Sequence, residues 1–381
     1  MEREVIEVAG KAKSERGAVT VVAVLALVLI LGVAALAVDL GMLRAARTQL
    51  SIAADAAALA GVKELAFGSR QRAFERSAEY AARNEALGEP VILNIGTGSE
   101  GDVVLGTFNF ADRTFQPEDF LPNAVRVTAR RSGERAVPTF FAAAFGHRLV
   151  NVSAQAIAVG YPRTVATVID RSASMAAPPF PDGEIAPARE AAAQFLHDLS
   201  LSTLPERAGV ISYASDVDVN ASIRGLHDAG EPGLLMALTR AIEAAPSGDL
   251  GGTNTGGAIE RAIETILDAE PGGGRDGGQR MIVLLSDGLA NRSPDHDCYR
   301  QEFPQNPCWR YAVEMARDAY AEGIVVHTIT LGGTEEDDTY QQMQEIAAAG
   351  GNGQALFAPT PEHLTEMFES LSRIAQVALV D

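Results

Sequence analysis

Three separated segments of the sequence carry oxygen-bearing side chains that together suit a divalent cation. The first has the pattern Asp-x-Ser-x-Ser, the second is the glycine-rich stretch 251–256, and the third is a Ser-Asp-Gly tripeptide. Between them they offer two carboxylates and three hydroxyls: Asp170, Ser172, Ser174, Thr253 and Asp287. Oxygen donors of this kind favour Mg²⁺ or Mn²⁺ over zinc. The chemistry that these residues predict is the binding of a hard dication.

Strands and helices alternate along residues 164–377, and their order predicts how the three segments are brought together. Short apolar runs typical of buried parallel strands lie at 165–169, 208–213, 281–285, 324–331 and 355–357. Helices are predicted at 185–199, 255–267, 309–321, 340–348 and 361–377. Repeated β-α units build an α/β fold with a doubly wound, mostly parallel sheet. Because ligands bind at the carboxyl ends of such strands, we expect the three segments to meet there.

With this three-part motif, residues 164–377 resemble a von Willebrand factor type A domain. Domains of this family carry a metal-ion-dependent adhesion site. The resemblance implies that the two carboxylates ligate directly or through water and that the three hydroxyls complete the set. The family often has glycine between the two serines, where this chain has Ala173, and this change leaves the ligands intact. Capping of helices and turns is the alternative explanation for any one of the segments.

The donor set also predicts what the site does. Two carboxylates and three hydroxyls, some of them acting through water, leave at least one position of an octahedral ion without a protein ligand. An Asp or Glu carboxylate from a partner protein can occupy that position. We therefore expect a metal-dependent protein-binding or adhesion module and not an enzyme.

Other functional classes find little support in the sequence. The formal net charge of −19 argues against nucleic-acid binding, which requires clustered lysine and arginine. No Gly-x-Ser-x-Gly or His-Glu-x-x-His pattern occurs, and the glycine-rich stretches 251–257 and 272–278 lack the Lys-Ser/Thr of a phosphate-binding loop. A metal-dependent hydrolase stays open as an alternative, because Mg²⁺ and carboxylates also serve phosphoryl chemistry.

The two cysteines of the chain, Cys298 and Cys308, lie shortly after Asp287. Outside the cytoplasm, we expect a disulfide that closes this short loop. Metal ligation together with His296 is the alternative, although it provides only three such ligands. The disulfide would brace a loop next to the predicted cation.

The apolar run 18–38 is long enough to cross a membrane. Its one polar side chain is the hydroxyl of Thr20, and as a helix the run spans about 31 Å. A cleaved signal sequence is the alternative, but the apolar part of such sequences has only about 7–15 residues. Four basic residues precede the run and two follow it closely: Arg3, Lys11, Lys13 and Arg16, then Arg44 and Arg47. This asymmetry predicts a single-pass anchor, with residues 1–17 in the cytoplasm and the bulk of the chain outside it.

Residues 39–160 are predicted to form a small α+β unit. The alanine-rich stretch 46–60 and residues 71–87 have helical composition. The small side chains suit either an ordinary alanine-rich helix or close packing against other membrane-anchored helices. Short β-type runs follow at 91–95, 103–110, 124–129 and 150–158, which predicts an antiparallel sheet that ends at Gly160-Tyr161-Pro162.

A further pattern consists of residues 16–19 (RGAV), the apolar run, residues 37–41 (AVDLG) and residues 53–60 (AADAAALA). It resembles the N-terminus of TadG-like proteins of the tight-adherence (Flp-type) pilus assembly family. Relatives that are processed like prepilins have glutamate five residues after a glycine, whereas Val22 stands at that offset from Gly17. The resemblance therefore implies a stable anchor in the bacterial inner membrane, followed by a pilin-like unit.

The two resemblances together predict a bitopic bacterial protein with a binding domain outside the cytoplasmic membrane. Its expected role is protein–protein contact in pilus assembly or surface attachment, with pilus assembly components as partners. An envelope scaffold or sensor unrelated to pili is the alternative.

Overall fold

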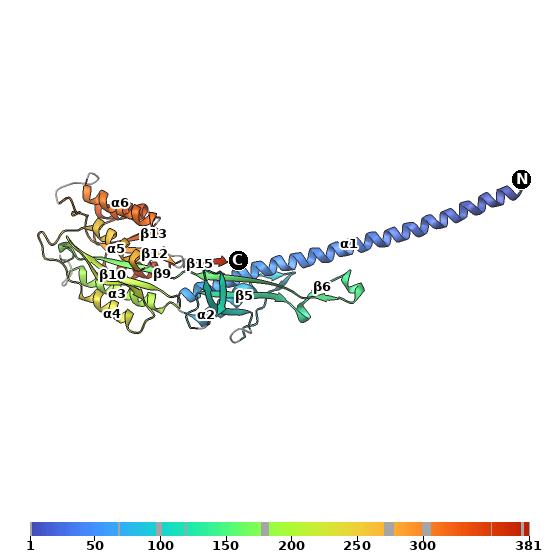
Figure 1. The fold of residues 1–381 in the computed structure, drawn as a ribbon, viewed down its shortest axis with the longest axis horizontal. Coiled ribbons are helices and arrows are strands. Elements are labelled where there is room, and N and C mark those ends of the chain that lie inside the picture. The colour runs from blue at the N-terminus through green and yellow to red at the C-terminus, as the bar shows by residue number, and fades with distance from the viewer. Residues whose placement is uncertain are drawn as a thin grey trace.

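The computed structural model describes residues 2–67, 69–96, 101–118, 120–176, 183–269, 278–298, 306–351, 353–374 and 377–380, with side chains from residue 19 onward except that of Pro361. A long N-terminal helix leads into two folded units, and the molecule is strongly elongated (Figure 1). The helix, α1 (Glu2–Ala66), contains the whole predicted span. Among the described residues it is the one helix that is long and apolar enough to cross a membrane, and its apolar part is not buried by the rest of the protein.

The first unit is an antiparallel sheet covered by the C-terminal half of α1. Its strand order is β15-β8-β5-β3-β4. The strands are β3 (Val103–Asn109), β4 (Thr114–Pro117), β5 (Ala124–Arg131), β8 (Val152–Gly160) and β15 (Val377–Val380). Ala53 and Ala57 of α1 are fully buried in the same core as Val125 and Val127 of the sheet. The small side chains of this helix therefore pack on the protein's own sheet.

Helix α2 (Arg70–Ala82) lies close against α1. A Cβ built on Gly61 would lie 2.2 Å from Oγ of Ser77, so only glycine permits this approach. The predicted helix 71–87 is wrong in its last residues, because β1 (Glu85–Ala86) and β2 (Glu89–Pro90) form a short hairpin. Both residues of its turn have positive φ, which reverses the chain and ends any helix. The predicted strand at 91–95 is also wrong, since these residues form no strand.

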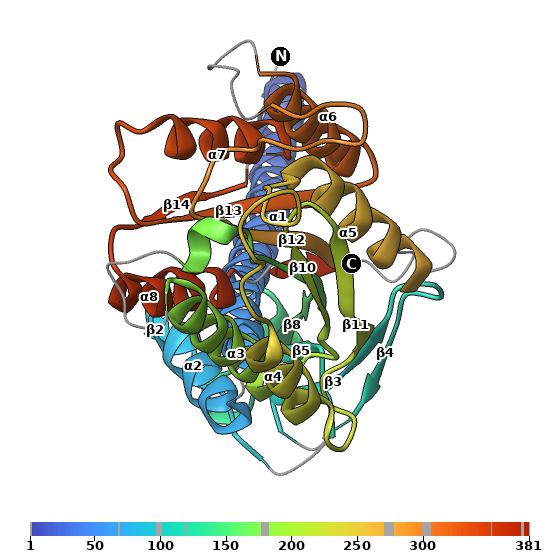
Figure 2. The same ribbon diagram turned by 90° about the vertical axis from the view of Figure 1, so that its left-hand side faces the viewer.

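The second unit is a six-stranded sheet, and its helices lie on both faces (Figure 2). The strand order is β11-β10-β9-β12-β13-β14, and all neighbours are parallel except β10 and β11. The strands are β9 (Arg163–Asp170), β10 (Arg207–Tyr213), β11 (Val217–Gly225), β12 (Gln279–Ser286), β13 (Ile324–Leu331) and β14 (Ala355–Ala358). The predicted doubly wound, mostly parallel sheet is confirmed.

The helices of the second unit cover the sheet three to a face. One face carries α3 (Ile185–Leu201), α4 (Glu231–Ala241) and α8 (Pro361–Ser372), and the other carries α5 (Thr255–Ala269), α6 (Pro307–Ala321) and α7 (Asp338–Ala349). The central strand β9 is buried along its whole length, with Val165 and Ile169 in one core and Ala166 and Val168 in the other. A strand buried on both faces reads as a continuous apolar run, which is why the sequence revealed it.

The end of the chain differs from its prediction. The last helix was expected to reach Val377, but α8 ends at Ser372 and residues 377–380 form strand β15. This strand pairs antiparallel with β8, so that Val377 faces Gly160 and Val380 faces Ile157. The segment is valine-rich and lies beside the edge of the first sheet, which favours a strand over a continued helix. The chain thus leaves the first unit, builds the second and returns to the first.

A buried ion pair holds the junction between the two units. Arg163 at the start of β9 donates from Nε and Nη2 to Oε1 of Glu206, at 3.0 and 2.6 Å. The two side chains are 1% and 0% exposed. Arg163 also donates from Nη1 to the carbonyls of Ser372 and Ile374, in the segment that leads to β15. One guanidinium therefore ties the first strand of the second unit to the returning chain.

Candidate metal centre

The deepest residue of the predicted site is Asp170, the last residue of β9. The parallel neighbour β12 ends at the same level, because Leu285 pairs with Ile169. Asp170 is fully buried, and its Oδ1 accepts the backbone N–H of Ser172 at 2.8 Å. Its Oδ2 accepts the hydroxyl of Ser286 at 2.6 Å. These bonds fix the carboxylate at the carboxyl ends of the two central strands.

A line of hydrogen bonds runs outward through the two serines of the motif. Oγ of Ser172 lies 3.0 Å from Oγ of Ser174, and Ser174 donates to Oδ1 of Asp287 at 2.8 Å. Ser172 is fully buried, Asp287 is half-buried and Ser174 is exposed. The group therefore opens to solvent on the side of Ser174.

Thr253 is positioned by the loop that follows β12. Its backbone N–H donates to Oδ1 of Asn291 at 2.7 Å, and its carbonyl accepts the backbone N–H groups of Asn291 and Arg292 at 3.0 and 3.2 Å. A Cβ built on Gly288 would lie 3.6 Å from Oγ of Ser174 and 4.0 Å from Oγ1 of Thr253. Both hydroxyls thus lie close to Gly288. The five predicted side chains come from three segments of the chain that meet at one edge of the sheet.

The glycine-rich stretch allows two of these loops to touch. The carbonyl of Gly251 accepts the backbone N–H of Ala173 at 3.1 Å. A Cβ built on Gly251 would lie 2.6 Å from the carbonyl oxygen of Pro246 and 2.7 Å from Cβ of Ala173. A side chain at position 251 would push the loops apart and move Thr253 with them.

Burial disfavours the charged form of both carboxylates of the site. Burial, followed by the charge of Asp170, raises the pKa of Asp287 to about 8, although its hydrogen bond with Ser174 acts in the opposite direction. Glu184 adds further repulsion to Asp287. Burial raises the pKa of Asp170 as well. The adjacent cation Arg171 is engaged elsewhere, at 2.9 and 2.7 Å from two exposed aspartates, Asp216 and Asp218.

The donor set fits a small hard dication. All five side chains offer oxygen, and two of them are acidic groups whose repulsion a bound dication would relieve. The part of the chain that the structure describes holds no cluster of three or more His, Cys, Asp or Glu side chains that suits a metal. A site with two carboxylates and three hydroxyls falls outside that description, because hydroxyl oxygens are not among those four residue types.

Three contributing residues were missed by the sequence analysis. Ser286 orients Asp170, Asn291 positions Thr253, and Glu184 raises the pKa of Asp287. Ser286 carried a signal, because it directly precedes Asp287 at the end of an apolar run. Asn291 and Glu184 had no such signal in the sequence, because their roles depend on contacts between segments that are distant along the chain.

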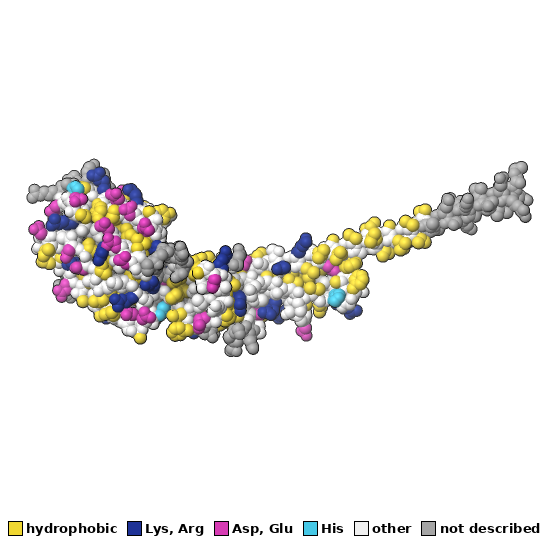
Figure 3. All heavy atoms as spheres, in the orientation of Figure 1, with side chains coloured by type: hydrophobic (Ala, Val, Ile, Leu, Met, Phe, Trp, Pro, Cys, Tyr) yellow, Lys and Arg dark blue, Asp and Glu magenta, His cyan; other side chains and the backbone are white. Residues whose placement is uncertain are grey.

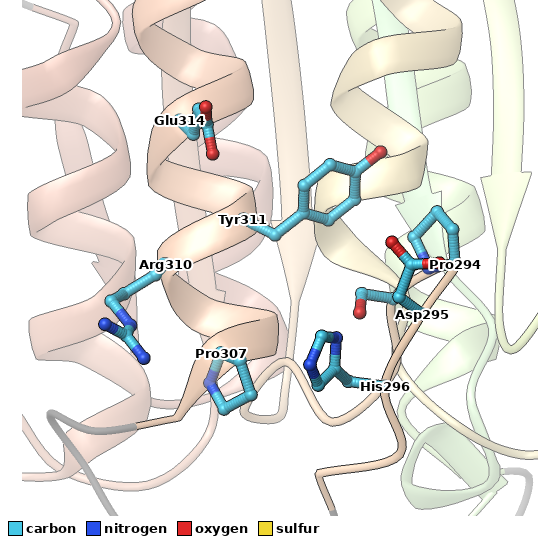
Figure 4. Close-up of a pocket in the computed structure, with 8 residues that line it drawn as sticks. Pro294, Asp295, His296, Pro307, Arg310, Tyr311 and Glu314 are labelled. Atoms are coloured by element: carbon cyan, nitrogen blue, oxygen red, sulfur yellow. The ribbon is translucent and has the colours of Figure 1, made fainter.

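The loop after Asp287 is braced by a disulfide between Cys298 and Cys308, which is the expected alternative of the two considered. Its first cysteine donates a backbone N–H to the carbonyl of Asn291 at 2.8 Å, so the brace reaches the residue that holds Thr253. An open hollow of about 380 Å³ lies beside the loop, lined by Asp295, His296 and Tyr311 of α6 among others (Figure 4).

Two family models match the chain. Residues 164–370 match the von Willebrand factor type A domain, and residues 37–158 match the Tad-like Flp pilus-assembly model. Among curated proteins, a UPF0353 protein of Mycolicibacterium paratuberculosis (strain ATCC BAA-968 / K-10) is 29% identical over 225 residues, which are 55% of this chain and 59% of that protein. The chain thus spans less than two thirds of the length of this relative.

Two solved structures are among those that match part of the chain. The conserved hypothetical protein BatB from Bacteroides thetaiotaomicron is 20% identical, with 55% of this chain and 97% of that chain covered and a TM-score of 0.40. The von Willebrand factor domain of the type V pili tip protein Mfa5 from Porphyromonas gingivalis is 16% identical, with 56% and 95% covered and a TM-score of 0.41. Because the first family model covers more than half of the sequence, the chain belongs to the von Willebrand factor type A domain family.

Proposed function

We propose that the chain is a membrane-anchored protein-binding module that holds Mg²⁺ or Mn²⁺ and acts in the assembly of a Tad-type pilus or in surface attachment. The proposed ligands are Asp170, Ser172, Ser174, Thr253 and Asp287. The observation that carries the proposal is geometric: Ser172 and Ser174 link the carboxylates of Asp170 and Asp287 by hydrogen bonds at a solvent-open edge, and burial raises the pKa of both carboxyl groups. When bound, the dication offers a coordination position to an Asp or Glu carboxylate of a partner protein.

The charge of the second unit explains why such binding would depend on the cation. From Val165 to Asp381 the sequence has 33 acidic residues against 13 arginines and no lysine. An acidic group of a partner is repelled by this surface, and like-charge contacts oppose association. A dication offsets the charge of the two carboxylates of the site and offers an acidic group of the partner a coordination position. Ser174 and Asp287 lie on the solvent-open side, whereas Asp170 holds the base of the site.

The setting of this domain supports the role in pili. The match of residues 37–158 to a Tad-like Flp pilus-assembly model favours pilus assembly components as partners. The apolar part of α1 supports a single-pass anchor in the inner membrane. The excess of basic residues before the span favours a cytoplasmic N-terminus and a binding domain outside the cytoplasm.

We expect a strain that lacks this chain to lose surface attachment and assembled pili. The full chain should restore both, and Asp287→Ala should restore neither, because the outer carboxylate of the site is then absent. The measurement is adhesion to a surface together with electron microscopy of pili, at matched amounts of protein in the membrane.

The matched control is Asp216→Ala, which removes an exposed aspartate near the site and leaves Arg171 paired with Asp218. This variant should restore attachment fully. Full restoration by Asp287→Ala would contradict the metal-dependent part of the proposal. Normal pili and attachment in the deletion strain would contradict the role in pilus assembly and attachment.

A further inference from the structure

A narrow hairpin extends from the first unit along the anchor helix (Figure 1). Its two short strands, β6 (Val137–Pro138) and β7 (Leu149–Val150), pair antiparallel. Between them lies the 3₁₀ helix η3 (Ala142–Phe145). We call residues 137–150 the hairpin arm and residues 139–148 its tip.

The tip is fixed to α1 at the point where the predicted membrane span ends. Asp39 follows the span directly and is 3% exposed. Its carboxylate accepts the backbone N–H groups of Phe140, Phe141 and Ala142 at 2.6, 2.8 and 2.9 Å. Three N–H donors compensate the charge, so this carboxylate can lie at the edge of an apolar layer without a cationic partner.

The tip also contacts α1 within the predicted membrane span. A Cβ built on Gly32 would lie 3.5 Å from Cε2 of Phe141, so this aromatic ring packs on the helix at Gly32. Gly32 lies seven residues before Asp39, which corresponds to about 10 Å along the helix axis. The contact is therefore inside the segment 18–38, at a depth where lipid surrounds a membrane-spanning helix.

The outer surface of the tip is apolar and unusually open for a soluble loop. Phe140 and Phe145 are 66% and 69% exposed, and Leu149 of the adjoining strand β7 is 55% exposed. The ring of Phe145 packs against that of Phe141 in a tilted arrangement, with centroids 5.1 Å apart. In Figure 3 the hydrophobic side chains at the end of the arm meet those of the apolar part of α1. The patch is thus continuous with the surface that a bilayer would cover.

We propose that the tip of the hairpin arm is a second membrane contact, which inserts Phe140 and Phe145 into the leaflet from which α1 emerges. The proposal rests on the membrane anchoring proposed above. Aromatic rings favour the boundary between acyl chains and headgroups, and the exposed His147 and Arg148 follow in the tip where headgroups would lie. Two contacts with the same leaflet restrict the tilt of the helix, so the arm sets the inclination of the first unit to the membrane plane.

The test is tryptophan fluorescence of the full chain in phosphatidylcholine nanodiscs that contain lipid brominated on its acyl chains. Phe145→Trp places a reporter in the tip, and the native Trp309 is 2% exposed in the core of the second unit and gives a constant background. Leu29→Trp reports on the span, where Leu29 is 69% exposed. We expect brominated lipid to quench Phe145→Trp at least threefold more than the control described next.

The matched control is Phe120→Trp, since Phe120 is 73% exposed in the same unit. Its carbonyl accepts Nη2 of Arg70 at 3.5 Å, which places it near the far end of α1. That end lies about 40 Å along the helix from Asp39. Brominated lipid should leave this variant unquenched, whereas aqueous iodide should quench it.

Each other outcome overturns the proposal in a distinguishable way. If Leu29→Trp is quenched by lipid and Phe145→Trp only by iodide, the tip lies in water and the anchor stands. If Phe145→Trp is shielded from both quenchers, the tip is covered by protein, such as a second copy of the chain. If Leu29→Trp escapes quenching by lipid, the proposed anchoring fails and the membrane contact of the arm fails with it.

Discussion

We expect that replacement of Asp170 by alanine lowers the affinity of the full chain for Mg²⁺ by at least about 100-fold, which corresponds to about 2.7 kcal/mol. The residue is fully buried at the base of the site and is the carboxylate that Ser172 and Ser286 orient. The substitution removes a proposed negative ligand and the carboxylate that accepts the backbone N–H of Ser172. The measurement is isothermal titration calorimetry in detergent or nanodiscs.

The same variant should remain folded, which separates loss of a ligand from loss of structure. Removal of Asp170 also removes its repulsion with Asp287, and the hydroxyl of Ser286 keeps the carbonyl of Gly288 as an acceptor at 3.1 Å. Mg²⁺ should raise the melting temperature of the wild-type chain and of the control Asp216→Ala, because a ligand that binds the native state stabilises it. It should leave that of Asp170→Ala unchanged. Unchanged Mg²⁺ affinity in Asp170→Ala would refute the assignment.

The substitution Glu206→Ala should destabilise the second unit by about 3–5 kcal/mol, the cost typical of leaving one member of a buried ion pair without its partner. The guanidinium of Arg163 is 1% exposed and would remain charged. Its contacts with the carbonyls of Ser372 and Ile374 do not replace a carboxylate. Equilibrium unfolding of the full chain in urea, followed by circular dichroism in detergent, measures this loss.

A surface ion pair on the same domain provides the control for this prediction. Arg240 and Glu190 lie 3.1 Å apart, and their side chains are 51% and 67% exposed. Glu190→Ala should change the free energy of unfolding by about 1 kcal/mol or less, because water screens exposed pairs. Equal effects of the two substitutions would show that the junction pair contributes nothing through its burial.

The candidate ligands could be predicted because their signals are local. Asp170 and Asp287 each stand at or directly after the end of a continuous apolar run, and a strand buried on both faces requires such a run. The edge of the sheet at which they meet follows from parallel strand order. Asn291, in contrast, acts on Thr253 through a contact between two loops, and no periodicity encodes such a contact.

The arm and the last strand could not be predicted for a related reason. Val377–Val380 has four residues, too few for a periodic pattern, and its partner β8 lies far earlier in the chain. Asp39 belongs to the quoted N-terminal pattern, but its partner Phe140 comes 101 residues later. The turn at Leu87 and Gly88 lacks the Asn-Gly or Asp-Gly pair that commonly marks such hairpins, so the helical composition before it was extended too far.

The central claim is that three loops of the second unit hold one dication. The most direct measurement is an anomalous difference map from crystals of the chain grown with Mn²⁺. The anomalous scattering of Mn²⁺ is much stronger than that of the protein atoms, so the map shows the position of the metal. We expect the strongest peak among the oxygens of Ser172, Ser174, Thr253 and Asp287, with Asp170 behind them. Manganese peaks elsewhere, with these side chains bonded only to one another and to water, would contradict it.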